Sequence, residues 1–332
     1  MPRIHERGDP TVKVLFWPEL PKNLQEMAEA RRPESIELEW LARDSSESVL
    51  LERLGGVDCL FSQASGPISP GVYPELGRLK LVQLLSAGYD FLDIDLARRN
   101  RLVVCSNGGA NAIAVAEHTV MLMLSVLRRL TALDAAMRTG GAKPDVASNH
   151  ELAGRSVGLL GLGFIGREVA KRLRGFEVEL LYHDVERAST ETEEAFGASF
   201  RSLPELLAES DVLSLHTPLN DQTRHIINRD TLSLMKPTAV LVNTARGELV
   251  DEGALAEALR EGRLMGAGLD VLSVEPPPSG HPLLATELGV VATPHSAGPT
   301  WESFPRRIEN AFANAERVGR GEAPLWVIPE LR

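Results

Sequence analysis

The chain has 332 residues, of which 43% are hydrophobic and 24% are charged. These values are typical of globular proteins, and the length predicts two domains rather than one. The formal net charge is −11 and no run of basic residues occurs, so nucleic acids and acidic membrane surfaces are not expected as partners.

Secreted, membrane-spanning and metal-binding proteins are not expected either. The sequence has no N-terminal apolar stretch like that of a signal peptide and no apolar run long enough to span a bilayer. Cys59 and Cys105 are the only cysteines, and they lack the spacing of a metal or redox site. The 8 histidines form no cluster of metal ligands. We therefore expect a protein of the reducing cytoplasm that binds no metal ion.

Taken in chain order, strand-like and helix-like segments alternate, which predicts an α/β fold with two doubly wound parallel sheets. Candidate strands of a first unit are residues 12–16, 36–40, 59–61, 81–84 and 102–105, with helices at 20–30 and 47–54. Candidate strands of a second unit are 156–160, 178–182, 211–215, 239–242, 266–270 and 289–292. A last helix is expected at about 300–319.

The segment 112–138 predicts one long helix that is apolar on more than one side. Met121, Leu122, Met123 and Leu124 follow one another, so they cannot share a single stripe. A helix that is apolar all round must be covered on all sides. We favour a second subunit as the cover, through a two-fold interface, and the alternative is burial between the two domains of one chain.

A glycine-rich loop, Gly161-Leu162-Gly163-Phe164-Ile165-Gly166, follows the expected strand 156–160 and precedes an expected helix at 167–174. In this context the first glycine allows a tight turn and the second lets the backbone approach a pyrophosphate. The third lets the helix pack on the strand, and the start of the helix supplies N–H groups to the phosphates. The loop therefore predicts a dinucleotide site of the Rossmann type.

Asp184 ends the next expected strand, 23 residues past Gly161, where the adenosine ribose lies in such sites. Its carboxylate can accept hydrogen bonds from both ribose hydroxyls and would repel the 2′-phosphate of NADP. The acid therefore favours NAD, and Glu186 adds to the repulsion. Arg187 is the one residue of this turn that could offset it, so the choice between NAD and NADP stays open at this point.

Arg246, Glu275 and His295 have the chemistry of hydride transfer to a keto acid, and each lies shortly after an expected strand. Arginine binds a carboxylate in a two-pronged fork, and histidine gives and takes a proton near neutral pH. A carboxylate beside the histidine favours the protonated ring. Singly, each could be a surface or turn residue, but ligands of open parallel sheets bind at the carboxyl ends of strands, which favours one shared site.

Together these segments resemble the D-isomer-specific 2-hydroxyacid dehydrogenases over nearly the whole chain. The resemblance is carried by residues 81–90, 114–118 and 215–219, by the glycine loop, and by the three catalytic segments. It implies a larger Rossmann domain that binds NAD, at 109–298, and a smaller flavodoxin-like substrate domain that is discontinuous, at 1–108 and 299–332. It also implies a homodimer and an NAD-dependent oxidoreductase that interconverts small 2-keto and 2-hydroxy acids.

The resemblance further implies a role for each site residue. Arg246 would hold the carboxylate and carbonyl of the substrate, His295 would be the acid/base, and Glu275 its partner. The backbone amides of Ser86, Ala87 and Gly88 would cradle the substrate carboxylate. Besides the glycine loop and Asp184, the cofactor would be lined by Thr217 and Pro218 at the adenosine, by Asp270 and the backbone of Thr244, Ala245 and Arg246 at the nicotinamide end, and by His295, Ser296, Ala297 and Gly298.

Departures from the family pattern narrow the substrate. Relatives usually carry a tryptophan shortly after the glycine that ends the long helix, and residues 142–145 here contain none. Residues 84–85 lack the basic residue found in relatives that handle phosphorylated acids, so a non-phosphorylated acid of the glyoxylate or hydroxypyruvate type is expected.

Two other functions stay open. A phosphite-type dehydrogenase is disfavoured, because residues 85–87 contain no lysine. The other is an NAD-sensing interaction protein of the C-terminal-binding corepressor type, which shares the fold and the catalytic residues. Turnover of NADH with small 2-keto acids separates the interaction protein from the enzyme.

Overall fold

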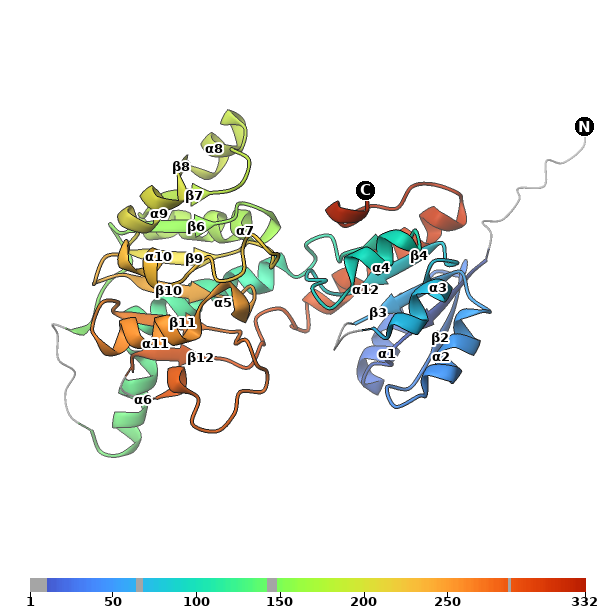
Figure 1. Ribbon diagram of the computed structural model, residues 1–332, viewed down its shortest axis with the longest axis horizontal. Helices are drawn as coiled ribbons and strands as arrows, with labels where there is room; N and C mark the ends of the chain where they lie inside the picture. The colour runs from blue at the N-terminus through green and yellow to red at the C-terminus, as the bar shows by residue number, and fades with distance from the viewer. Residues whose placement is uncertain (1–10, 64–67, 142–147, 286–287) are drawn as a thin grey trace, which may run out of the picture. The chain divides into compact units, whose positions relative to one another are not determined.

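The computed structural model describes residues 11–63, 68–141, 148–285 and 288–332 (Figure 1). It divides into two compact units, one formed by Met1–Asn111 with Thr300–Arg332 and the other by Ala112–Pro299. Each unit is built on one parallel sheet, so the predicted class of two parallel-sheet α/β domains is confirmed. The predicted absence of an aromatic contact from residues 142–145 lies outside the described residues.

The first unit has a five-stranded sheet in the order β2-β1-β3-β4-β5, which is the flavodoxin-like order that was expected. Its strands are β1 Val12–Phe16, β2 Ile36–Trp40, β3 Cys59–Ser62, β4 Leu81–Leu84 and β5 Val104–Cys105. Its α-helices are α1 Lys22–Glu29, α2 Glu47–Leu54, α3 Tyr73–Leu76, α4 Ile94–Arg99 and α12 Ser303–Gly319. β5 is shorter than predicted, because the amide of Leu102 bonds the carbonyl of Ala97 in α4.

The helix α12 returns the end of the chain to this first sheet. Its residues Phe304, Ile308 and Phe312 are buried in the same cluster as the strand side chains. The side-chain amide of Asn314 donates to the side-chain oxygen of Gln83 in β4 at 2.8 Å, and both residues are 0% exposed. Because a buried amide that loses its partner costs about 1–3 kcal/mol, this pair ties α12 firmly to β4.

The second unit has a seven-stranded sheet in the order β12-β11-β10-β9-β6-β7-β8. Its strands are β6 Ser156–Leu160, β7 Glu179–His183, β8 Ala198–Phe200, β9 Val212–Leu215, β10 Val240–Asn243, β11 Gly266–Leu269 and β12 Val290–Ala292. Its α-helices are α5 Ala112–Leu127, α6 Leu130–Arg138, α7 Phe164–Leu173, α8 Thr190–Phe196, α9 Leu203–Glu209, α10 Arg229–Ser233 and α11 Glu252–Arg260. The strand order reverses between β6 and β9, and ligands of such sheets bind at the carboxyl ends of the strands at that point.

Three elements of the second unit differ from the prediction. β8 was not expected, because a strand of three residues at the edge of a sheet is too short to show a periodic pattern. The helix expected at 167–174 begins earlier, at Phe164, with Gly163 as its N-cap. The single helix expected at 112–138 is two helices, because Arg129 adopts a left-handed conformation with φ of +51° between α5 and α6.

The apolar sides of α5 are covered mainly by its own unit. The helix packs against β10, β11 and β12 and also against α7. Gly266 and Gly268 permit this approach, since a Cβ on Gly268 would lie 2.9 Å from Cβ of Leu122. Ile113 and Met121 stay 40% and 43% exposed. All-round apolarity of α5 therefore does not by itself require a second subunit, which corrects that step of the sequence reasoning.

Within the described residues, no helix is long and apolar enough to cross a membrane. The same residues contain no group of three or more histidine, cysteine, aspartate or glutamate side chains that could hold a metal ion.

Candidate active site

The glycine loop forms a tight turn between β6 and α7 at the switch point of the second sheet. Gly161 has a φ of +104°, and a Cβ there would lie 2.7 Å from the carbonyl oxygen of His216 and 3.1 Å from the amide of Thr217. A Cβ on Gly166 would collide with the carbonyl oxygen of Gly161. A Cβ on Gly163 would meet nothing within 4 Å, so the backbone at the start of α7 faces open space. The three glycines thus have the geometry expected of a pyrophosphate loop: a tight turn, close packing and an open approach to the backbone.

Asp184 lies at the end of β7 and braces this loop. Its carboxylate accepts the amide hydrogen of Leu162 at 2.9 Å and that of Val185 at 2.8 Å. The side chain is therefore fixed beside the glycine turn, where a dinucleotide's ribose would lie. An open backbone at Gly163 and a fixed acid at Asp184 fit NAD.

Arg187 is engaged by other residues of its own unit. Its guanidinium donates two hydrogen bonds to Glu193 of α8, both at 2.9 Å, and lies 5.8 Å from the ring centroid of Phe200. Glu193 also accepts a hydrogen bond from Tyr182 at 2.8 Å. These hydrogen bonds, from Arg187 first, lower the pKa of Glu193 to about 2. Arg187, the residue that could favour NADP, is thus held by Glu193 in a charge-assisted pair.

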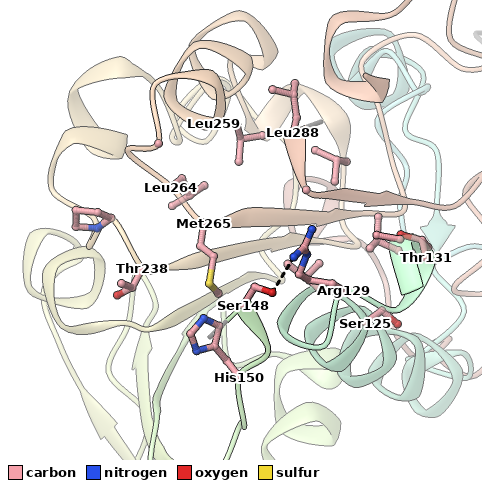
Figure 2. Close-up of a pocket in the computed structure, with 17 residues that line it drawn as sticks. Ser125, Arg129, Thr131, Ser148, His150, Thr238, Leu259, Leu264, Met265 and Leu288 are labelled. Carbon is pink, nitrogen blue, oxygen red and sulfur yellow. Dashed lines mark hydrogen bonds between the residues drawn. The ribbon is translucent and has the colours of Figure 1, made fainter. Parts of the chain in front are cut away.

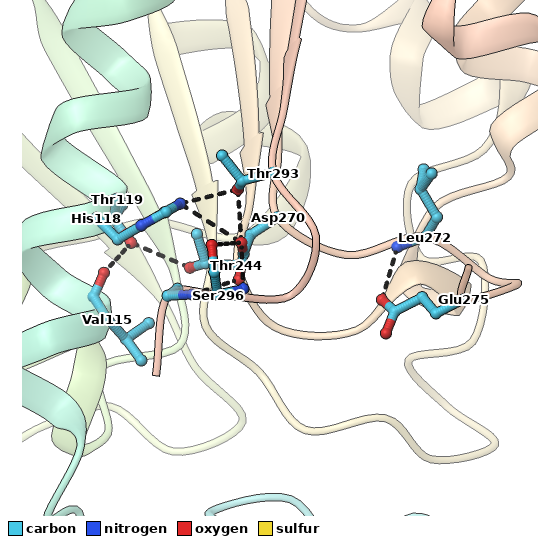
Figure 3. A network of polar contacts seen from close by, with 10 residues as sticks. Val115, His118, Thr119, Thr244, Asp270, Leu272, Glu275, Thr293 and Ser296 are labelled. Atoms are coloured by element: carbon cyan, nitrogen blue, oxygen red, sulfur yellow. Dashed lines mark hydrogen bonds and ion pairs between the residues drawn. The ribbon is translucent and has the colours of Figure 1, made fainter. Parts of the chain in front are cut away.

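Asp270 follows β11 and bonds Thr293 and Ser296, which lie on either side of His295 in the sequence (Figure 3). Only 1% of it is exposed, and its carboxylate accepts the amide hydrogens of Ser296 and Ala297, both at 2.9 Å. Its backbone carbonyl accepts the amide hydrogen of His295 at 2.7 Å. These bonds hold His295 in a left-handed conformation, with φ of +50°, which a non-glycine residue rarely adopts without such support.

Two side chains of α5 join this network. His118 Nε2 lies 2.9 Å from Thr293 Oγ1 and 3.4 Å from Asp270 Oδ1, and Thr293 donates to the same carboxylate at 2.5 Å. The hydroxyls of Thr119 and Thr244 are 3.0 Å apart. Helix α5 therefore ties together the carboxyl ends of β10, β11 and β12 (Figure 3).

His295 and Glu275 form a close pair. His295 Nδ1 lies 2.7 Å from Glu275 Oε2, and the other oxygen of Glu275 accepts the amide hydrogen of Leu272 at 3.0 Å. The side chains of His295 and Glu275 are 46% and 36% exposed. Because Nδ1 faces the carboxylate, Nε2 is the ring nitrogen that can act on a substrate.

Arg246 lies just beyond β10 in the same unit and is partly exposed. Its Nη1 donates to the carbonyl of Ala245 at 2.6 Å. The next residue, Gly247, packs so closely on the backbone of Leu272 and Ser273 that a Cβ would collide with it. The segment that bears Arg246 and the loop that bears Glu275 are therefore in direct contact.

The predicted substrate loop belongs to the first unit. The hydroxyl of Ser86 donates to the carbonyl of Gly88 at 2.7 Å, and the carbonyl of Ser86 accepts the amide hydrogen of Asn107. Asn107 is fully buried, and its own carbonyl accepts a hydrogen bond from Asn310 of α12 at 2.9 Å. The loop is thus anchored to the core of its unit.

A cavity of about 530 Å³ lies at the other end of the strands of the second sheet, away from the glycine loop (Figure 2). It is lined by residues that precede strands, such as Thr238 before β10, Met265 before β11 and Leu288 before β12, and by Arg129 and His150. Arg129 donates to Ser148 there at 2.8 Å. Because it lies at the amino ends of the strands, this cavity is separate from Arg246, Glu275 and His295, which follow the carboxyl ends.

Comparison with known proteins agrees with this geometry. The model of the D-isomer specific 2-hydroxyacid dehydrogenase NAD-binding domain matches residues 120–297. A glyoxylate reductase of Thermofilum pendens is 40% identical and covers 84% of this chain and 83% of its own. The chain belongs to the D-isomer specific 2-hydroxyacid dehydrogenase family.

Solved structures resemble this dehydrogenase over nearly its whole length. A glyoxylate reductase from Paecilomyes thermophila has a TM-score of 0.84 and 31% identity, covering 97% of this chain and 100% of that one. D-lactate dehydrogenase with NAD⁺ from Lactobacillus jensenii has a TM-score of 0.79 and 28% identity, covering 95% and 99%. The dehydrogenase is an NAD-dependent oxidoreductase of a small 2-hydroxy or 2-keto acid, so the predicted family, enzyme class and cofactor are confirmed.

Several supporting residues of the site escaped the sequence reasoning. His118 lies in a segment that carried the family resemblance, but no role was expected for it. Thr119 and Thr293 gave no signal, because single threonines are common on surfaces.

Proposed function

We propose that the dehydrogenase reduces glyoxylate, hydroxypyruvate or a similarly small, non-phosphorylated 2-keto acid with NADH, and that His295 supplies the proton. The proposal rests on the 2.7 Å contact between His295 Nδ1 and Glu275 Oε2, which leaves Nε2 of a half-exposed ring for the substrate. The glyoxylate reductases among the relatives support the substrate class.

When bound, NADH would supply the hydride that reduces the keto carbon. His295 in its protonated form donates from Nε2 to the carbonyl oxygen as negative charge develops there. Glu275 fixes the plane of the ring and leaves Nε2 for the substrate, since its carboxylate is itself held by the amide of Leu272. The products are the 2-hydroxy acid, NAD⁺ and a neutral imidazole that regains its proton from solvent.

Arg246 is the residue that we assign to the substrate's carboxylate and carbonyl. A guanidinium binds a planar carboxylate through two parallel hydrogen bonds, which fixes the orientation of the keto group as well as its position. We assign the backbone amides of Ser86, Ala87 and Gly88 to the same carboxylate. The bond of the Ser86 hydroxyl to the Gly88 carbonyl shapes that loop, so backbone N–H groups are the proposed donors.

The glycine loop and Asp184 are the proposed sites for the pyrophosphate and the adenosine ribose, with Thr217 and Pro218 beside the adenosine. Thr244, Ala245, Arg246, Asp270 and residues 295–298 are proposed to lie around the nicotinamide end. For Asp270 we propose an indirect contribution, because its carboxylate already accepts hydrogen bonds from Thr293, Ser296 and Ala297. A preference for NADH over NADPH follows from Asp184 and from the capture of Arg187 by Glu193.

A homodimer in the cytoplasm is also proposed. Helix α6 has no buried residue, and its Leu130 and Met137 are 56% and 74% exposed. A second copy that covers α6 would bury these side chains. Cys59 and Cys105 are free and buried, as suits a reducing compartment. Light scattering should give twice the mass of one chain, and the mass of a single chain would contradict the dimer.

A panel of 2-keto acids tests the proposed function. Purified enzyme with NADH should reduce glyoxylate and hydroxypyruvate with a higher kcat/KM than pyruvate, phenylpyruvate or 2-ketogluconate. Failure to oxidise NADH with any of these acids would overturn the proposed substrate class.

A further inference from the structure

The loop that carries Glu275 has little apolar packing to hold it. It runs from β11 to the 3₁₀ turn Pro282–Leu284, and none of the residues from Leu272 to Gly280 is buried. Its internal hydrogen bonds are few, and the bond from the Leu272 amide to Glu275 is one of them. A loop of this kind is mobile unless another element fixes it, and a proton-transfer pair requires a fixed geometry.

Glu252, the first residue of α11, bonds both ends of this loop. Its Oε1 accepts the amide hydrogen of Ser273 at 2.6 Å, and its Oε2 lies 3.1 Å from Nε2 of His281. The amide of Leu283 donates to Nδ1 of His281, so Nε2 is the nitrogen that carries a proton toward Glu252. The side chains of His281 and Glu252 are only 10% and 19% exposed.

Glu252 itself is held in place by its neighbours in the sequence. Asp251, the residue before it, caps α11 by accepting the amide hydrogen of Ala254 at 3.0 Å. Five residues before Glu252, Gly247 lies against the backbone of Leu272 and Ser273. The segment 246–252 therefore carries Arg246 at one end and the carboxylate that holds the Glu275 loop at the other.

We propose that Glu252 is a positioning residue for the reduction: its carboxylate fixes the loop so that Glu275 meets His295. This inference rests on the proposed role of Glu275 and His295. The competing explanation is that Glu252 only stabilises α11, as an acid in the first turn of a helix does. The two explanations differ in whether the effect of Glu252 depends on Glu275.

The experiment is a double-mutant cycle on Glu252 and Glu275, read by kcat/KM for glyoxylate across pH. Glu252→Ala should lower kcat/KM about 10-fold or more, and it should shift the pH profile in the same direction as Glu275→Gln is expected to shift it. Glu252→Gln keeps an acceptor for the Ser273 amide, so its kcat/KM should fall less than that of Glu252→Ala. The kcat/KM of His281→Ala should lie between those of the parent and of Glu252→Ala. In the Glu275→Gln background, Glu252→Ala should add less than about a 2-fold loss.

The control is Glu261→Ala, which removes an exposed acid just beyond the other end of α11 and should leave kcat/KM and the pH profile unchanged. Parental kinetics in Glu252→Ala, or the same fold-loss in the parent and in the Glu275→Gln background, would overturn the positioning role while leaving the Glu275–His295 pair intact. Parental kinetics and pH profile in Glu275→Gln would overturn the pair itself, and this inference with it.

Discussion

Replacing Gly247 with alanine should impair catalysis without preventing cofactor binding. A Cβ there would lie less than 3.0 Å from the backbone of Leu272 and Ser273, at the start of the Glu275 loop. Carbon atoms in contact are about 3.5–4.0 Å apart, so the loop or the Arg246 segment must move by more than about 1 Å. Because a 1 Å misplacement of reacting groups can cost about 10²-fold, we expect kcat/KM for glyoxylate to fall about 10- to 100-fold.

Steady-state oxidation of NADH measures this loss, and quenching of protein fluorescence measures the Kd for NADH, which should change far less than kcat/KM does. The matched control is Gly175→Ala, because a Cβ at Gly175 would meet nothing within 4 Å. That variant should keep parental kcat/KM. A Gly247→Ala enzyme with the kinetics of the parent would refute the inference that contact between the two segments sets the geometry of the site.

Three further predictions concern the substrate, the cofactor and acid stability. Arg246→Lys keeps the charge but loses the planar fork, so KM for glyoxylate should rise about 10-fold or more, and near-parental kinetics would place the anchor elsewhere. Asp184→Ser should narrow the preference for NADH over NADPH. Adding Glu193→Gln should narrow this preference further, because it weakens the hold of Glu193 on Arg187. Equal kcat/KM for NADPH in the single and double variants would contradict the inference that Glu193 keeps Arg187 from the cofactor. Desolvation lowers the pKa of His216 from 6.5 to about 3, so the folded protein keeps the ring neutral while the unfolded chain takes up a proton below pH 6.5. Its contribution to stability is therefore complete above pH 6.5 and is lost as the pH falls toward 3, by at most about 1.4 kcal/mol per pH unit. Urea denaturation at pH 7 and pH 5 should show a smaller loss in His216→Gln than in the parent, and equal losses would count against this pKa.

The glycine loop could be predicted from the sequence because its constraints are local. Gly161 needs a positive φ and Gly166 a close approach, and no other residue type satisfies either. The break at Arg129 could not be predicted, since a left-handed arginine carries no sequence signal for a helix end. The edge strand β8 was equally hidden, because three residues show no reliable alternation.

The residues that we propose as reactive were also easier to single out in the sequence than the residues that contact them. Arg246, Glu275 and His295 are recognisable by chemical type and by their place after strands. Glu252 resembles any helix-terminal acid until the fold brings it to Ser273, 21 residues away, and His118 meets Thr293 across 175 residues. Such contacts follow from the packing of α5 and α11 on the sheet, which no local pattern encodes.

The role of His295 is tested most directly by kcat for glyoxylate reduction in His295→Ala, measured with saturating NADH beside the Kd for NADH. If Nε2 delivers the proton, kcat should fall by roughly 10²–10⁴-fold, or about 3–5 kcal/mol of barrier, while the Kd hardly changes. Equal kcat in variant and parent would contradict the assignment of His295 as the acid/base.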